Sequence, residues 1–114
     1  MKTFFNGFET NEATFKSNPA LNANRAVALT ISGKVDYPDE GGEITGILTS
    51  YRDGIASVVM KGYAMASFNE TVPQVGICKL APGKKGFMEV DEENGKAYTV
   101  LSVDTNSKTI EFIL

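Results

Sequence analysis

The chain has 114 residues, of which 42% are hydrophobic and 22% are charged, and its formal net charge is −3. This length fits one domain with one core, and the composition is that of an ordinary globular protein. With no histidine and one cysteine, a histidine proton shuttle, a disulfide framework, a cysteine zinc site and an iron–sulfur cluster are excluded. The mildly acidic charge argues against nucleic acid as a partner, and no apolar run approaches the roughly 20 residues of a membrane helix.

The first part of the chain differs from the rest in composition. It holds four of the seven phenylalanines among many asparagines, and neither helical nor strand periodicity extends across it. We predict an extended N-terminal arm over residues 1–24. Isolated phenylalanines in a polar segment need an apolar surface to rest on. They either cover the domain's own core or dock on a neighbouring chain as anchors, unless the arm is disordered; the predicted anchors are Phe4, Phe5, Phe8 and Phe15.

From Arg25 onward the pattern changes to short β segments. Residues 27–31 alternate apolar and polar side chains, as a half-buried strand does, and this strand is expected to extend toward residue 35. Further strands are predicted at residues 44–51, 55–60, 63–68, 75–78, 87–90, 97–103 and 109–114. Asp53-Gly54 predicts a tight hairpin turn, and Gly46 predicts a bulge or a close approach of backbones. Seven or eight short strands separated by turns predict a compact all-β domain over residues 25–114, a small barrel or sandwich.

Few residues suggest chemistry. Cys78 has no histidine to activate it and is expected to be a small buried hydrophobe. The acidic segments 36–43 and 91–93 are interpreted as solvated turns; a weak calcium site is the alternative, although both lack the spacing of a calcium-binding loop. The pair Lys84-Lys85 lies in a predicted hairpin tip without the spacing of a phosphate-binding loop. We predict no catalytic, cofactor-binding or metal site, no cofactor, and a protein that is not an enzyme.

Four stretches carry a resemblance to a known family. They are residues 25–35, residues 39–48 with their acidic-Gly loop before Ile44-Thr45-Gly46-Ile47-Leu48, residues 53–59, and residues 95–104 leading to an apolar final strand. Together they resemble the capsid decoration, or cement, proteins of tailed bacteriophages. The resemblance implies a compact β fold, often a homotrimer, that is made in the host cytoplasm and sits on the outer capsid surface of the virion. Its partner would be the major capsid protein, whose neighbouring subunits it would clamp.

The expected function is therefore that of a structural virion protein. In this interpretation the arm places aromatic anchors on neighbouring subunits, and many copies on one lattice add avidity. One alternative is another virion β module, such as a tail-tube, head-completion or fibre-base component. The other is a small glycan-binding β domain that uses tyrosines where tryptophan is absent; the chain offers Tyr37, Tyr51, Tyr63 and Tyr98.

Overall fold

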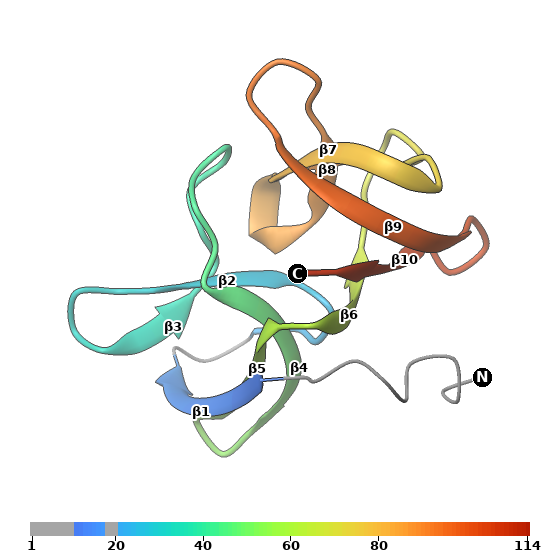
Figure 1. Cartoon of the computed structure of the whole chain (residues 1–114). Helices are drawn as coiled ribbons and strands as arrows, with labels where there is room; N and C mark the ends of the chain where they lie inside the picture. Colours follow the sequence, from blue (N-terminus) through green and yellow to red (C-terminus); the bar gives the residue numbers. More distant parts are fainter. Residues whose placement is uncertain (1–10, 18–20) are drawn as a thin grey trace.

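The computed structural model describes residues 11–17 and 21–114, and within them the chain is built of ten strands and one turn of 3₁₀ helix. The first five strands close into a small barrel in the order β1-β3-β2-β4-β5 (Figure 1). Their bounds are β1(Asn11–Ser17), β2(Ala26–Leu29), β3(Lys34–Asp36), β4(Gly46–Arg52) and β5(Ile55–Lys61). The tight turn predicted between β4 and β5 is confirmed, since Asp53 and Gly54 adopt φ angles of 53° and 80°.

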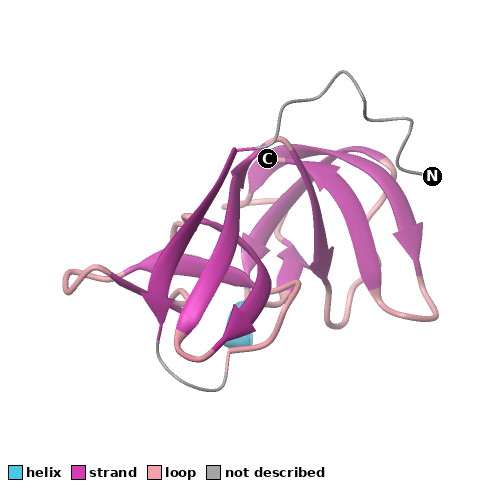
Figure 2. Ribbon diagram, turned by 90° about the horizontal axis from the view of Figure 1, so that it is seen from below, coloured by secondary structure: helices cyan, strands magenta, loops and turns pink. Residues whose placement is uncertain are grey.

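The last five strands form a second sheet in the order β6-β10-β9-β7-β8. Their bounds are β6(Tyr63–Ser67), β7(Gly76–Pro82), β8(Met88–Val90), β9(Lys96–Asp104) and β10(Thr109–Ile113), and the 3₁₀ turn Lys84–Gly86 joins β7 to β8. All strand pairs in this sheet are antiparallel. A parallel bridge between Phe68 and Met88 connects its two ends, so the sheet curls strongly beside the barrel (Figure 2).

The barrel and the second sheet share a wall. Because successive side chains of a strand point to opposite faces, Leu48 and Val58 fill the barrel, while their neighbours Ile47 and Val59 pack into the core of the second sheet. Val59 is 3% exposed and the other three are fully buried. Strands β4 and β5 are therefore buried on both faces here, and the two halves are packed together through them.

Gly46 lies in this wall, where backbones approach closely as the sequence predicts. A Cβ atom at Gly46 would collide with the backbone oxygen of Val59 and would lie 2.7 Å from Cγ1 of Val58. Backbone atoms of a neighbouring strand cannot yield as a flexible side chain does. Only glycine fits this position without displacing β5.

The all-β prediction and the small barrel are confirmed, but two segments differ from expectation. Residues 11–17, which the sequence assigns to the arm, form β1, antiparallel to β5 and parallel to β3. The β body therefore includes at least residues 11–17 in addition to the predicted 25–114, because these two partners supply backbone hydrogen bonds that local sequence does not reveal. Residues 1–10 and 18–20 of the predicted arm lie outside the described residues.

The second difference concerns the strand expected over residues 27–31 and onward to 35. The chain instead reverses direction after β2, and Leu29 pairs with Val35 of β3. Gly33 adopts a φ of 85°, a left-handed conformation that side chains other than glycine rarely take. The turn at residues 30–33 therefore splits the predicted strand into a hairpin.

Candidate interaction surfaces

Of the four predicted anchors, the structure describes Phe15 alone. Its half-buried side chain packs against the barrel core of its own chain. This placement matches the interpretation in which a phenylalanine covers the domain's own core. Phe4, Phe5 and Phe8 lie outside the described residues, so their role as anchors stays a prediction.

One exposed apolar surface is the hairpin tip, which we define as residues 29–34 between the bodies of β2 and β3. Ile31 is fully exposed, at 107% of the reference area, and Leu29 is 49% exposed. Figure 1 shows this turn projecting from the barrel on the side away from the second sheet. The sequence does not predict this surface, because the alternation of Val27, Leu29 and Ile31 is typical of one continuous buried strand face.

A second exposed apolar surface is the loop patch, formed by Val72, Val75 and Ile77 at the start of β7. These side chains are 51%, 64% and 72% exposed. No charged residue occurs between Glu70 and Lys79. In Figure 1 the loop from β6 to β7 lies on the opposite side of the molecule from the hairpin tip. A groove beside the patch is lined by Val72 and Ile77 together with Lys79 and Glu92, so its rim carries both signs of charge.

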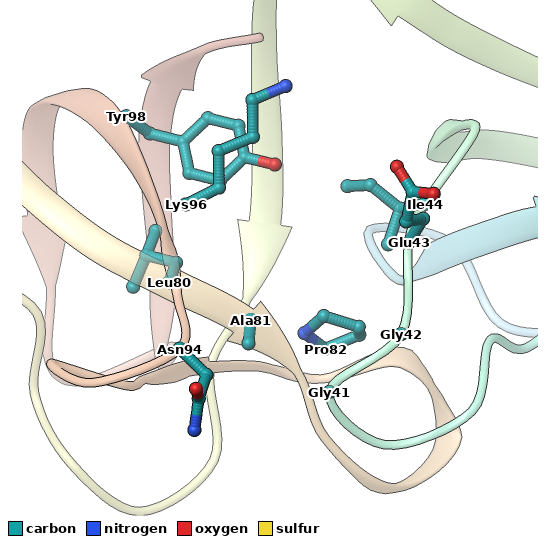
Figure 3. Close-up of a pocket in the computed structure, with 10 residues that line it drawn as sticks. All are labelled: Gly41, Gly42, Glu43, Ile44, Leu80, Ala81, Pro82, Asn94, Lys96 and Tyr98. Atoms are coloured by element: carbon teal, nitrogen blue, oxygen red, sulfur yellow. The ribbon is translucent and has the colours of Figure 1, made fainter.

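A small pocket of about 190 Å³ lies between the loop at residues 41–44 and strands β7 and β9. Figure 3 shows the hydroxyl group of Tyr98 pointing into this space toward Glu43 and Ile44, with Lys96 crossing the tyrosine ring. Burial raises the pKa of Tyr98 above 10.0, so its phenol stays neutral at physiological pH. The ring also packs edge-on against Phe112, with ring centroids 5.4 Å apart, which fixes its orientation.

The other three tyrosines of the glycan-binding alternative lie elsewhere. Tyr51 and Tyr37 pack against the barrel core, and the Tyr37 hydroxyl accepts a hydrogen bond from the backbone N–H of Asn22 at 2.9 Å. Tyr63 lies on β6, and burial together with the neighbouring Glu111 raises its pKa to about 12. The four rings therefore build no common stacking platform, and only Tyr98 lines the pocket of Figure 3.

The remaining sequence features have structural explanations. Cys78 is 6% exposed in the core of the second sheet, which confirms its prediction as a buried hydrophobe. In the acidic segment 91–93, the Asp91 carboxylate accepts the backbone N–H groups of Glu93 and Asn94 at 3.2 and 2.9 Å, which shapes the turn into β9. Across residues 11–17 and 21–114, no three histidine, cysteine or acidic side chains gather in a group that could hold a metal ion. The same residues contain no helix long and apolar enough to cross a membrane.

The basic pair Lys84-Lys85 belongs to the 3₁₀ turn, and Arg25 holds this turn against the barrel. The Arg25 guanidinium lies 3.7 Å from the centre of the Phe87 ring and donates a hydrogen bond to the backbone oxygen of Lys85 at 3.1 Å. A Cβ atom at Gly86 would collide with the backbone oxygen of Ala26. The close fit indicates that this turn is part of the packing between the two halves.

The sequence matches none of the protein-family models and none of the curated proteins compared with it. Among solved structures, the fold is similar to that of the N base of the head fiber protein gp8.5 of bacteriophage phi29. The TM-score is 0.70, the sequences are 13% identical, and the similarity covers 93% of this chain and 94% of that chain. The two chains therefore share a fold over almost their whole length.

Proposed function

We propose that this protein is a structural component of a phage virion, attached to the outer surface of the head. The observation that carries the proposal is the fold shared over 93% of the chain with the base of a phage head fiber protein. The resemblance of four sequence stretches to phage decoration proteins leads independently to the same part of the virion. In this role the protein binds the major capsid protein and stabilises contacts between its subunits, without catalysis and without a cofactor.

The architecture suits such a role physically. Two cores that share a wall make a stiff body, and a stiff body loses little conformational entropy when it binds. The apolar hairpin tip and loop patch lie on opposite sides of this body, so one can contact the shell while the other contacts a further copy. We assign the loop patch to self-association, with three copies of its uncharged centre meeting at the axis of the homotrimer that the resemblance implies; its rim offers Lys79 and Glu92 for pairing between copies.

The base of a head fibre is the second candidate, and the solved phage neighbour favours it. A fibre base and a cement protein both attach to the head from outside, but they differ in stoichiometry. A cement protein that clamps neighbouring subunits would occupy every equivalent position of the shell lattice, whereas a fibre base would need only the positions that carry a fibre. The number of copies bound per head therefore separates the two.

The test is a binding experiment with heads of the cognate phage that lack this protein. Purified chain is mixed with these heads, pelleted with them, and counted per head at saturation; heads that already carry the protein are the matched control. We expect saturable binding at a symmetry-related copy number, and a trimer in light scattering of the free protein. Failure of the chain to pellet with deficient heads at micromolar concentration would refute the proposed function.

A further inference from the structure

We propose that the hairpin tip is the anchor that inserts into an apolar pocket with an acidic rim on the shell protein. This inference rests on the proposed attachment to the head and names the element that makes it. The partner is thus identified by its chemistry: a protein surface with a small hydrophobic depression beside carboxylate groups.

The hairpin tip exposes apolar side chains to solvent. Ile31 is 107% exposed and Leu29 is 49% exposed, whereas Val27 and Val35 in the same hairpin are fully buried. The Ile31 side chain therefore adds nothing to the core, yet it presents its whole apolar surface at the end of a projection. A single projecting aliphatic side chain of this kind fits a pocket of a partner better than a flat face.

The turn is held rigid by hydrogen bonds, although Ile31 at its end is fully exposed. The backbone N–H of Thr30 donates to the backbone oxygen of Lys34 at 2.7 Å, and that of Gly33 donates to the oxygen of Thr30 at 2.9 Å. The Thr30 hydroxyl lies 2.9 Å from the Ser32 hydroxyl and 2.9 Å from the Lys34 oxygen, to which it donates.

The base of the turn is held in the same way. The backbone N–H of Leu29 donates to the Thr45 hydroxyl at 2.8 Å. The hairpin tip is thus pre-organised, which reduces the ordering cost of binding.

The charge and the position of the hairpin tip also suit an anchor. Lys34 is the single charged residue between Arg25 and Asp36, in a chain of net charge −3. The hairpin tip is thus locally basic and suits an acidic rim around the pocket. It also projects from the body in both views, as the loop at the left of Figures 1 and 2. A projection at this position can reach into a depression while the body stays clear of the surface.

A second copy of the chain is the competing occupant. If the hairpin tip of one copy entered the groove beside the loop patch of the next, the contact would join unlike surfaces from opposite sides of the molecule. Unless the rotation between copies closes a ring, such a contact produces an open filament. Light scattering of Ile31→Ser distinguishes this outcome from binding to the shell, because the variant loses the trimer expected of the free protein only if the tip contacts a second copy.

The experiment compares Ile31→Ser with the matched control Ile55→Ser, which changes an isoleucine that is 45% exposed on another hairpin of the same barrel. Both variants are first checked for unchanged thermal unfolding, and then bound to deficient heads. We expect Ile31→Ser to weaken head binding by about tenfold or more, while Ile55→Ser binds as the unmodified chain does. Lys34→Glu should also weaken binding, and its effect should shrink at high salt. Thr30→Val keeps Ile31 but removes its supporting hydroxyl, and it should cost about threefold.

Three outcomes would overturn the inference. If the unmodified chain binds heads and Ile31→Ser binds equally well, the hairpin tip is not the anchor, although the proposed function stands. If Ile31→Ser instead changes the oligomeric state, the tip contacts a second copy. If the unmodified chain itself fails to bind, the proposed function fails and the inference fails with it.

Discussion

The shared wall between the barrel and the second sheet predicts that the two halves unfold as one unit. Ile47 and Leu48 are adjacent, fully buried, and point into different cores. Replacing either by alanine removes three carbon atoms from a core. The transfer free energy lost is about 2.4 kcal/mol, at ~0.8 kcal/mol per methylene. The cavity left behind raises the total loss in free energy of unfolding to about 3–4 kcal/mol. For a domain of about 100 residues this lowers Tm by about 12–16 °C, at ~4 °C per kcal/mol.

The assay is urea unfolding followed by the backbone amide NMR signals of Tyr51 in the barrel and Tyr98 in the second sheet. Because β4 contributes to both cores, we expect a single unfolding transition in each of Ile47→Ala and Leu48→Ala. The Tyr51 and Tyr98 signals should report the same urea midpoint, shifted below that of the unmodified chain. The free energy of unfolding should fall by similar amounts in the two variants. Ser50→Ala, at an exposed position of the same strand, is the control and should stay within about 0.5 kcal/mol of the unmodified chain.

A specific result would refute this reasoning. If Leu48→Ala unfolds the barrel while the Tyr98 signal keeps its original midpoint, the barrel and the second sheet are independent units. The wall formed by β4 and β5 would then be a contact between two domains and not a common core. The stiffness used to support the proposed function would be lost as well.

Three further predictions concern single positions. Gly46→Ala should lower the free energy of unfolding by about 1–3 kcal/mol in urea titration, because the new Cβ collides with the Val59 backbone; an unchanged midpoint would show that β5 can move aside. Glu111→Gln should lower the pKa of Tyr63 from about 12 toward 10.0 in an ultraviolet absorbance titration. Since folding raises this pKa, the neutral phenol stabilises the fold below pH 10.0, and that contribution is lost as the pH rises through about 12. Hydrogen bonds from the backbone N–H groups of Ser107 and Asn106 lower the pKa of Asp104 below 3.8. The ionised Asp104 carboxylate therefore stabilises the folded state above pH 3.8, and this contribution is lost as the pH falls below that value. Asp104→Ala should consequently lose less stability on acidification than the unmodified chain.

Two strands could be predicted from sequence almost to the residue. The sequence predicts a strand over residues 55–60, and β5 covers Ile55–Lys61; it also predicts a strand over residues 109–114, and β10 covers Thr109–Ile113. Strand β10 alternates regularly, with Ile110 and Phe112 buried in the core. Strand β5 is instead marked by its apolar run and the turns around it, because Val58 and Val59 are buried on opposite faces. The turn at Asp53-Gly54 was equally predictable, since few residues tolerate positive φ angles.

The first strand could not be predicted, because its stability comes from distant parts of the chain. Ala13, Phe15 and Ser17 face inward in β1, but only Phe15 is a strongly apolar signal. Glu12 pairs with Val59 and Lys16 with Ile55, more than 35 residues away in sequence. Pairing over such a separation depends on the fold as a whole, which local composition does not report.

The exposed apolar surfaces could not be predicted from the sequence for a different reason. A pattern shows which side chains are apolar but not which of them the fold buries. The alternation of Val27, Leu29 and Ile31 therefore predicted a buried strand face, and it was correct for Val27 alone. The charge-free loop patch gave no signal either, since a short uncharged stretch is common in loops and in strands.

Leu29 and Ile31 are the positions where the sequence pattern and the fold disagree most clearly. Local sequence and global fold normally agree in natural proteins, and exceptions concentrate where function imposes a cost. Exposed apolar side chains at a projecting turn promote unwanted association in solution, and the polar residues that usually form turns would avoid this cost. The threonine and serine hydroxyls around Ile31 instead hold the turn in one conformation. Full exposure on a rigid turn is what an anchor requires, and among the residues that the structure describes no other large apolar side chain is as exposed as Ile31.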